Sequence, residues 1–212
     1  MKFDQKGIFG PFTIVTSVIT GSIFPLLGSL LALDLQVIET PYYGGIFLVM
    51  FGGFIAQWLF AHTIHDLVHI KIEQRQTLSK QALKFYLVVA AIILLVIAVY
   101  LSYMRGWPVF VFALIGAVAC LYAEGFLHHE SQMAFGAMFL VIGGFYVQAA
   151  TLDLAPIVWL KVVIMSLFAF FSQYGWLLFY RLDDYGWSKK VKNRSILVAK
   201  TGLLFLIVYF IL

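Results

Sequence analysis

Long runs of apolar residues recur along almost the whole of this 212-residue chain. Each run approaches the ~20 residues that a helix needs to cross a bilayer core of about 30 Å. The chain is 63% hydrophobic and 11% charged, whereas soluble domains carry about 25% charged residues. The runs are continuous, so the alternating pattern of a membrane β-barrel is absent. The sequence therefore predicts an all-α, polytopic membrane helical bundle in which 1–212 form a single integral membrane domain.

Seven transmembrane helices are expected, and their ends fall at charged or polar clusters and beside three of the prolines. The first apolar run is too long for the hydrophobic region of a cleaved signal peptide. The single cysteine, Cys120, lies within an apolar run and excludes an intrachain disulfide. The predicted spans are 11–33, 45–69, 83–103, 107–125, 133–151, 157–180 and 195–212.

Lysine and arginine residues gather in the segments that a seven-span bundle places on one side. These segments are the amino terminus, the second-to-third connection and the sixth-to-seventh connection, whereas the other side offers only Arg105 and Lys161. By the positive-inside rule the first side faces the cytoplasm, which predicts an inner-membrane protein with a cytoplasmic amino terminus. The net charge of +4 belongs to these juxtamembrane clusters and gives no reason to expect a nucleic acid partner.

The stretch AHTIHDLVHIKIE, residues 61–73, ends the second predicted span with five ligand-type side chains. On a helix that turns about 100° per residue, all five share an arc of roughly 100°. Neighbours at i,i+3 and i,i+4 spacing suit chelation, and bundle metalloproteins add ligands from a facing helix. Other candidates lie at the same predicted end, with Glu124 near them. The candidate metal ligands are His62, His65, Asp66, His69, Glu73, His128, His129, Glu130, Asp183 and Asp184.

Two explanations of this polar end remain open from the residues alone. In one, the histidines form an interfacial stripe that reaches water, and the carboxylates pair with Lys71 and Arg75. In the other, the groups bind a divalent metal. Imidazole ligands favour Zn, Fe, Cu or Ni, whereas Mg²⁺ prefers oxygen ligands, and Mn suits a mixed set.

The stretch 61–73 and two later stretches resemble motifs of the UbiA superfamily of membrane prenyltransferases. Ala61-His62-Thr-Ile-His65-Asp66-Leu-Val-His69 lies over the family pattern Ala-Asn-x-x-Asn-Asp-x-x-Asp, and Glu73 falls on a further family aspartate. GGFYVQ, 143–148, is similar to the Gly-x-Tyr-Tyr-Val-Gln of quinone-pathway members. The stretch 184–195, DYGWSKKVKNRS, falls on the second motif, Asp-x-x-x-Asp followed by Gly-Lys-Arg-Thr-like residues.

The resemblance implies a helical bundle around a central cavity, in which aspartate motifs hold Mg²⁺ ions that bind an isoprenoid diphosphate. Asp66 and Asp184 would be the catalytic metal ligands. Arg75, Lys189 and Arg194 would bind the diphosphate of the substrate. The implied activity is metal-assisted processing of an isoprenoid or related membrane lipid, most simply prenyl transfer to an acceptor.

The chain departs from the family pattern at several motif positions. Of five family aspartates, two are present, and His69, Glu73 and Ser188 occupy the other positions. Family members usually have nine spans, so a partner membrane subunit or a second copy is expected to close the shorter bundle. Two alternatives to prenyl transfer therefore remain: a histidine-rich transition-metal protein with a redox or transport role, and a non-catalytic subunit of a membrane complex.

Two glycine pairs lie within predicted spans. Gly52-Gly53 and Gly143-Gly144 are expected to allow close helix approach rather than to bind phosphate, because small residues let membrane helices approach each other.

Overall fold

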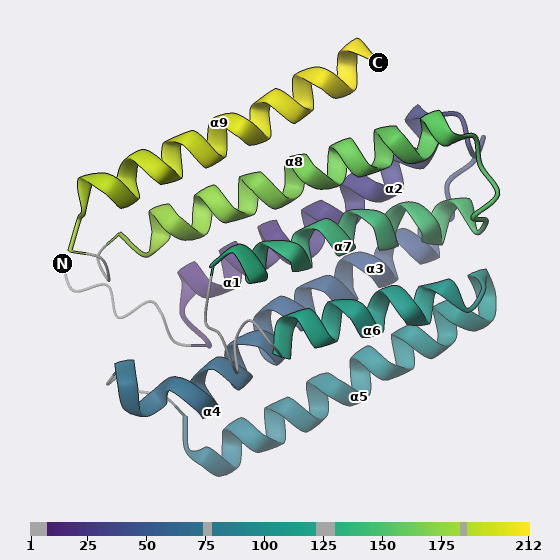
Figure 1. The fold of residues 1–212 in the computed structure, drawn as a ribbon. Helices are drawn as coiled ribbons and strands as arrows, with labels where there is room; N and C mark the ends of the chain where they lie inside the picture. Colours follow the sequence, from purple (N-terminus) through teal and green to yellow (C-terminus); the bar gives the residue numbers. More distant parts are fainter. Residues whose placement is uncertain (1–7, 74–77, 122–129, 183–185) are drawn as a thin grey trace.

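The structure is a computed structural model, which describes residues 8–73, 78–121, 130–182 and 186–212. This part of the chain is helical throughout, apart from turns and short connections (Figure 1). Two long rods each contain a π-helical segment. The first is α1 (Pro11–Val18), η1 (Ile19–Ile23) and α2 (Phe24–Asp34), and the second is α3 (Tyr43–Ile55), η2 (Ala56–Ala61) and α4 (His62–Glu73). The remaining helices are α5 (Lys80–Arg105), α6 (Pro108–Leu121), α7 (Glu130–Ala149), α8 (Pro156–Tyr180) and α9 (Lys189–Ile211).

Each predicted span overlaps one of these helices or rods within the described residues, and the all-α prediction is confirmed for those residues. In the described part of the chain, six helices are long and apolar enough to cross a membrane, which makes this an integral membrane protein. The helix in the fourth predicted span is shorter. Its 14 described residues correspond to about 21 Å at 1.5 Å per residue. Seven crossings therefore stay a prediction.

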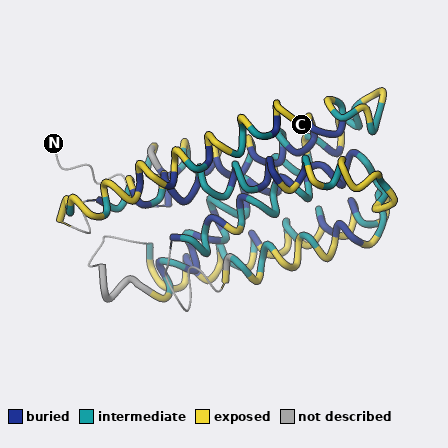
Figure 2. The backbone as a smooth tube through the Cα atoms, turned by 45° about the horizontal axis from the view of Figure 1, so that its top comes forward, coloured by how far each residue is buried: buried dark blue, intermediate teal, exposed yellow. Residues whose placement is uncertain are grey.

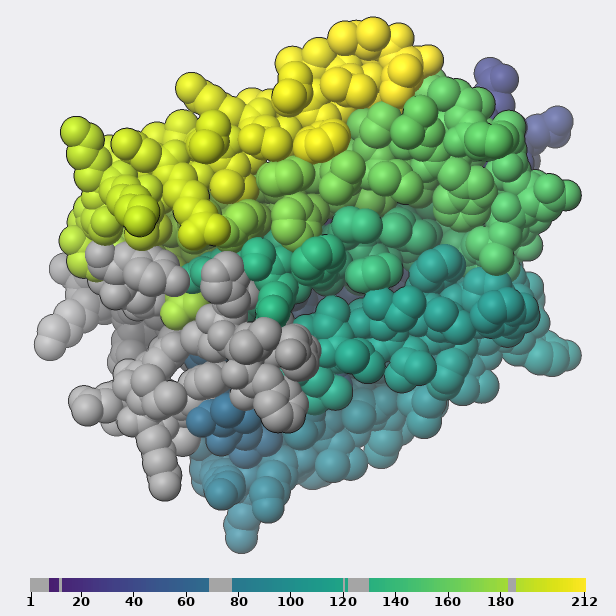
Figure 3. Space-filling model, in the orientation of Figure 1, coloured from purple at the N-terminus to yellow at the C-terminus, as the bar shows by residue number. Residues whose placement is uncertain are grey.

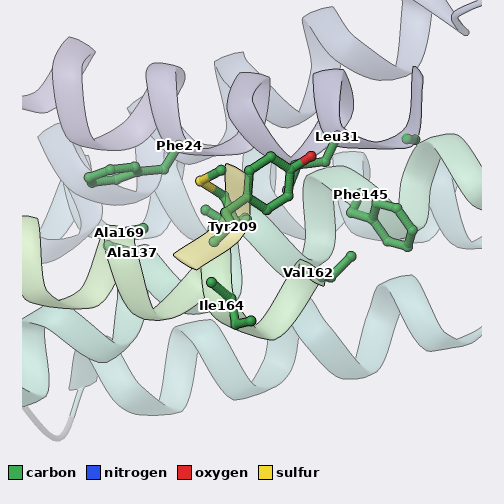
Figure 4. Packing of buried hydrophobic residues seen from close by; sticks show 11 residues of the cluster. Phe24, Leu31, Ala137, Phe145, Val162, Ile164, Ala169 and Tyr209 are labelled. Atoms are coloured by element: carbon green, nitrogen blue, oxygen red, sulfur yellow. The ribbon is translucent and has the colours of Figure 1, made fainter. Parts of the chain in front are cut away.

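The helices form a bundle with α9 and α5 at opposite edges (Figure 1). α9 packs against α8, α8 against α7, and α7 against α2, while α3 and α6 lie between α7 and α5. The largest core cluster lies among α2, α7 and α8, where Phe24, Phe145 and Val162 are buried (Figure 4). Tyr209 of α9 completes it, and its hydroxyl donates to the Asp34 carboxylate. Exposed positions gather on the outer sides of the bundle (Figure 2) and include many large apolar side chains, as a lipid-facing surface requires.

Glycines bring the first rod into backbone contact with α3 and α7. A Cβ atom at Gly53 would lie 2.0 Å from the Gly21 carbonyl oxygen, and one at Gly144 would lie 2.1 Å from the Pro25 carbonyl oxygen. Close approach was predicted for both glycine pairs, and it is confirmed at these second members. The first members have room for a side chain: the nearest atoms lie 3.6 Å from a Cβ at Gly52 and 4.0 Å from one at Gly143.

Gln148, the last residue of the GGFYVQ stretch, links the end of α7 to Tyr42, the residue before α3, at the end of the bundle opposite α4. Its Oε1 accepts from the Tyr42 backbone N–H at 2.8 Å, and its Nε2 donates to the Tyr42 carbonyl at 3.2 Å. The Arg105 guanidinium donates to the carbonyls of Val147 and Gln148. The Arg105 bonds satisfy carbonyls that the end of α7 leaves without helical partners. The Gln148 side chain bonds the backbone of Tyr42, so this glutamine has a structural role.

Candidate functional site

The described candidate residues lie at one end of the bundle, on the left in Figure 1. This end contains α4, the first residue of α7, the end of α8 and the beginning of α9. The helices alternate in direction, so candidate site residues that are far apart in the sequence lie at the same end of the bundle.

The first polar cluster begins where η2 passes into α4. His62 Nδ1 lies 2.7 Å from the Gln57 carbonyl oxygen. A carbonyl oxygen only accepts hydrogen bonds, so this bond requires the proton on Nδ1 and, in the neutral ring, places the lone pair on Nε2. The bond spans five residues, which is the spacing of a π-helical turn. π-Helical turns within α-helices occur frequently at functional sites.

One turn further along α4, His65 and Asp66 form a second polar contact. His65 Nδ1 lies 3.3 Å from Asp66 Oδ1, and Asp66 is 5% exposed. A carboxylate or carbonyl partner on one ring nitrogen is the usual way in which proteins orient a metal-binding histidine. The neighbouring Thr63 is fully buried, and its hydroxyl has no hydrogen-bond partner in the described structure.

Several candidate ligands fall outside what the structure describes. His69 and Glu73 lie within α4, so their backbones continue the predicted helix, but their side chains are outside the described part. The candidate site residues that lie wholly outside the described part of the chain are Arg75, Glu124, His128, His129, Asp183 and Asp184. Among the described residues, no three or more His, Cys, Asp or Glu side chains gather as a metal-binding group. The metal site therefore stays a prediction.

Glu130, a predicted metal ligand, contacts a protein cation in the structure. Arg181 NH1 donates to Glu130 Oε1 at 3.0 Å, and the exposed fractions of the two side chains are 17% and 3%. Glu130 is also the first residue of α7, where the helix dipole favours a negative charge. Arg181 belongs to the basic sixth-to-seventh connection, and nothing in the local sequence pattern links it to Glu130, 51 positions away.

Two of the three basic residues predicted to bind diphosphate, Lys189 and Arg194, lie on α9. The Arg194 guanidinium lies over the Tyr174 ring, 5.4 Å from its centroid. Lys189 is exposed at the first residue of the helix. Ser195 donates to the Gly175 carbonyl at 2.7 Å and so connects α9 to α8. Because α9 packs on α8 while α4 packs on α5 and η2, the described residues form two separate polar clusters at this end.

An apolar cavity of about 200 Å³ lies beside the first cluster, between the second rod, α5, α6 and α7. Among its described lining residues, only Gln57 has a polar side chain, and Phe60, Phe112 and Phe139 contribute aromatic rings. A hollow lies between α6 and α7 on the face shown in Figure 3. Sequence reasoning missed this cavity. It arises where glycines such as Gly116 and Gly136 leave space: a Cβ at either would meet no atom within 4 Å.

Comparisons with protein-family models, with curated proteins and with solved structures find no match. The fold and these features define an integral membrane helical bundle with polar clusters at one end and an apolar cavity among its helices. Function must therefore be argued from the site.

Proposed function

We propose that the protein binds an isoprenoid chain in the apolar cavity and acts on its polar end, with a divalent metal, at the α4 end of the bundle. Prenyl transfer is the simplest such reaction. The distribution of lysine and arginine favours a cytoplasmic location for this end, in an inner membrane.

The observation that carries the proposal is that the cavity and the histidine cluster share one residue, Gln57. Gln57 contributes the polar side chain of the cavity lining, and its backbone carbonyl binds His62. A molecule with an apolar chain and a polar head therefore fits across this junction, because each part meets a matching surface. The lining residues extend from Leu48 to Phe60 along the second rod, a length of about 18 Å at 1.5 Å per residue.

The residues at the junction suit a divalent cation. The Nδ1 atoms of His62 and His65 face a carbonyl and a carboxylate, which is the arrangement that orients an imidazole for binding through its other nitrogen. Asp66 adds a carboxylate that is shielded from solvent. A bound divalent cation would supply Lewis-acid stabilisation of the charge on a departing diphosphate.

Prenyl transfer needs little further chemistry from the chain. The bond between the allylic carbon and the diphosphate oxygen breaks, and its electron pair leaves with the diphosphate. The acceptor forms a new bond to that carbon and loses a proton. The ring faces of Phe60, Phe112 and Phe139 attract positive charge, and the apolar lining excludes water from the reactive carbon.

We expect Asp66→Asn to weaken Mg²⁺-dependent binding of geranylgeranyl diphosphate by about tenfold or more, which corresponds to 1.4 kcal/mol. The substitution keeps the size of the side chain and removes the negative charge that a cation-dependent site requires. Binding to purified protein in detergent is measured with and without Mg²⁺. Asp153→Asn is the control, because Asp153 is exposed and lies in the connection before α8, far from α4.

Filling the cavity tests the chain-binding half of the proposal separately. Gly136→Leu is expected to lower the affinity for both geranylgeranyl diphosphate and geranylgeraniol by about tenfold or more, since each displaced CH₂ loses roughly 0.8 kcal/mol of burial. A Cβ at Gly136 meets no atom within 4 Å, so the fold should tolerate the change. Ala91→Leu introduces the same side chain at an exposed position of α5 and should leave both affinities unchanged.

The orientation of the two histidines also favours a second candidate, a transition-metal site without prenyl transfer, because imidazole ligands select Zn, Fe or Cu over Mg²⁺. Elemental analysis of the purified protein distinguishes the two. Retained Zn, Fe or Cu, together with no Mg²⁺-dependent binding of the prenyl diphosphate, would replace the leading proposal by this one. No bound metal and no response to Asp66→Asn would favour a non-catalytic subunit.

A further inference from the structure

A second pocket of about 200 Å³ lies on the other side of the bundle, between the η1 region of the first rod and α8. In contrast to the apolar cavity, several of its lining residues carry hydrogen-bonding groups: Thr16, Thr20, Ser172 and Gln173. It shares no lining residue with the apolar cavity, so it does not depend on the function proposed above.

Gln173 is the central residue of this pocket. It is 6% exposed, and its Oε1 accepts a hydrogen bond from Thr20 Oγ1 at 3.0 Å. The other end of the amide has no hydrogen bond in the described structure. Exchanging the amide oxygen and nitrogen does not alter this result. In either orientation the Thr20 hydroxyl bonds one of the two amide atoms, and the other atom has no hydrogen bond.

An amide group without a partner is costly at this position. Gln173 lies within a transmembrane helix, seven residues before its end at Tyr180, and this separation is about 10 Å along the axis. Burying an amide without a hydrogen bond costs roughly 1–3 kcal/mol in proteins. The free end of the amide keeps some accessible surface, so a molecule that enters the pocket can supply the missing partner.

The surroundings of the pocket indicate where this partner comes from. Ile19 and Trp176, which also line it, are 48% and 42% exposed. Their exposed sides face outward from a transmembrane part of the bundle, where the surrounding medium is lipid. The depth of about 10 Å from the helix end brings the pocket close to the level of lipid ester carbonyls and hydroxyls.

We infer that this pocket binds a membrane lipid through a hydroxyl or carbonyl oxygen, which hydrogen-bonds to Gln173. Phe24 and Trp176 pack against the apolar part of the same lipid, and the π-helical η1 lies at the space between the first rod and α8. π-Helical turns are rare and concentrate at functional sites, and η1 contributes Ile19 and Thr20 to this pocket.

Dioleoylglycerol with brominated acyl chains tests the inference, because bromine quenches tryptophan fluorescence on contact and Trp176 lines the pocket. We expect saturable quenching that Trp176→Phe removes. Gln173→Leu should weaken the quenching affinity by roughly threefold to tenfold, the effect of one lost hydrogen bond. Thr20→Val should weaken it in the same direction, because it removes the hydroxyl that holds the Gln173 amide in place. Gln81→Leu makes the same amide-to-leucine change at an exposed position of α5 and should leave the affinity unchanged.

Brominated squalane, a hydrocarbon without oxygen atoms, separates hydrogen bonding from general apolar contact. Equal quenching by squalane and by dioleoylglycerol, or equal dioleoylglycerol affinity in the wild type and both polar variants, would overturn the inference and would leave water as the partner of the amide. Thr20→Val keeps the test valid if Gln173→Leu fails to fold, because it removes the second hydrogen-bonding group of the pocket without changing the volume of the side chain.

Discussion

Gly144→Ala is expected to destabilise the protein by about 4 kcal/mol or more, within the range that marks disruption of close packing. The new Cβ would lie 2.1 Å from the carbonyl oxygen, 2.9 Å from the carbonyl carbon and 3.0 Å from the Cα of Pro25. All three are backbone atoms of α2, which cannot move aside as a flexible side chain would. The two helices would have to separate, and the separation would disrupt the core cluster that α2, α7 and α8 share.

The adjacent glycine provides a matched control for this prediction. A Cβ at Gly143 would meet its nearest neighbour at 4.0 Å, and alanine is favoured over glycine in a helix by roughly 0.8–1.0 kcal/mol. Gly143→Ala should therefore be neutral or stabilising. Thermal unfolding in detergent is the measurement, and the expected loss for Gly144→Ala is about 8–16 °C, from 2–4 °C per kcal/mol in a chain of this size. Equal unfolding temperatures for the two variants would contradict the close contact between α2 and α7.

Most of the helical architecture could be predicted from the sequence, because the length of each apolar run sets the length of a membrane helix. The predicted 45–69 span, for example, corresponds to the rod that α3, η2 and α4 form. Close approach at Gly53 and Gly144 could also be predicted from residue size. Their partners, Gly21 and Pro25, could not be predicted, because they depend on which helices become neighbours.

Less of the candidate site could be predicted. The predicted span ended at residue 69, and α4 continues to Glu73, as the shared arc of the five ligand-type residues requires. The apolar pattern gave no sign that a π-helical turn would bring the Gln57 carbonyl to His62. The predicted topology grouped Glu130 with the metal ligands, because it places the fourth-to-fifth connection at the same end, but it does not reveal that Arg181 lies opposite this carboxylate. The apolar cavity is formed by missing side chains at Gly116 and Gly136, a feature that becomes visible only once the helices are packed.

The second large effect is expected at the ion pair between Glu130 and Arg181. Glu130→Leu and Arg181→Leu should each cost about 2–4 kcal/mol of stability, because each leaves a largely buried charge without the partner that it has in the structure. The double variant should be more stable than the sum of the single effects predicts, by at least about 1.5 kcal/mol, since it removes both charges together. Thermal unfolding of the wild type, the two single variants and the double variant measures this coupling energy.

The same double-mutant cycle also tests whether Glu130 acts as a metal ligand. The Arg181 guanidinium lies 3.0 Å from the Glu130 carboxylate, and this contact requires no cation from solution. The coupling energy should therefore be the same in EDTA and in Mg²⁺, and Glu39→Gln, a change at an exposed carboxylate, should alter stability in neither. A coupling energy that depends on the metal would instead return Glu130 to the predicted ligand set, because a cation that Glu130 binds would compete with Arg181 for the same oxygens.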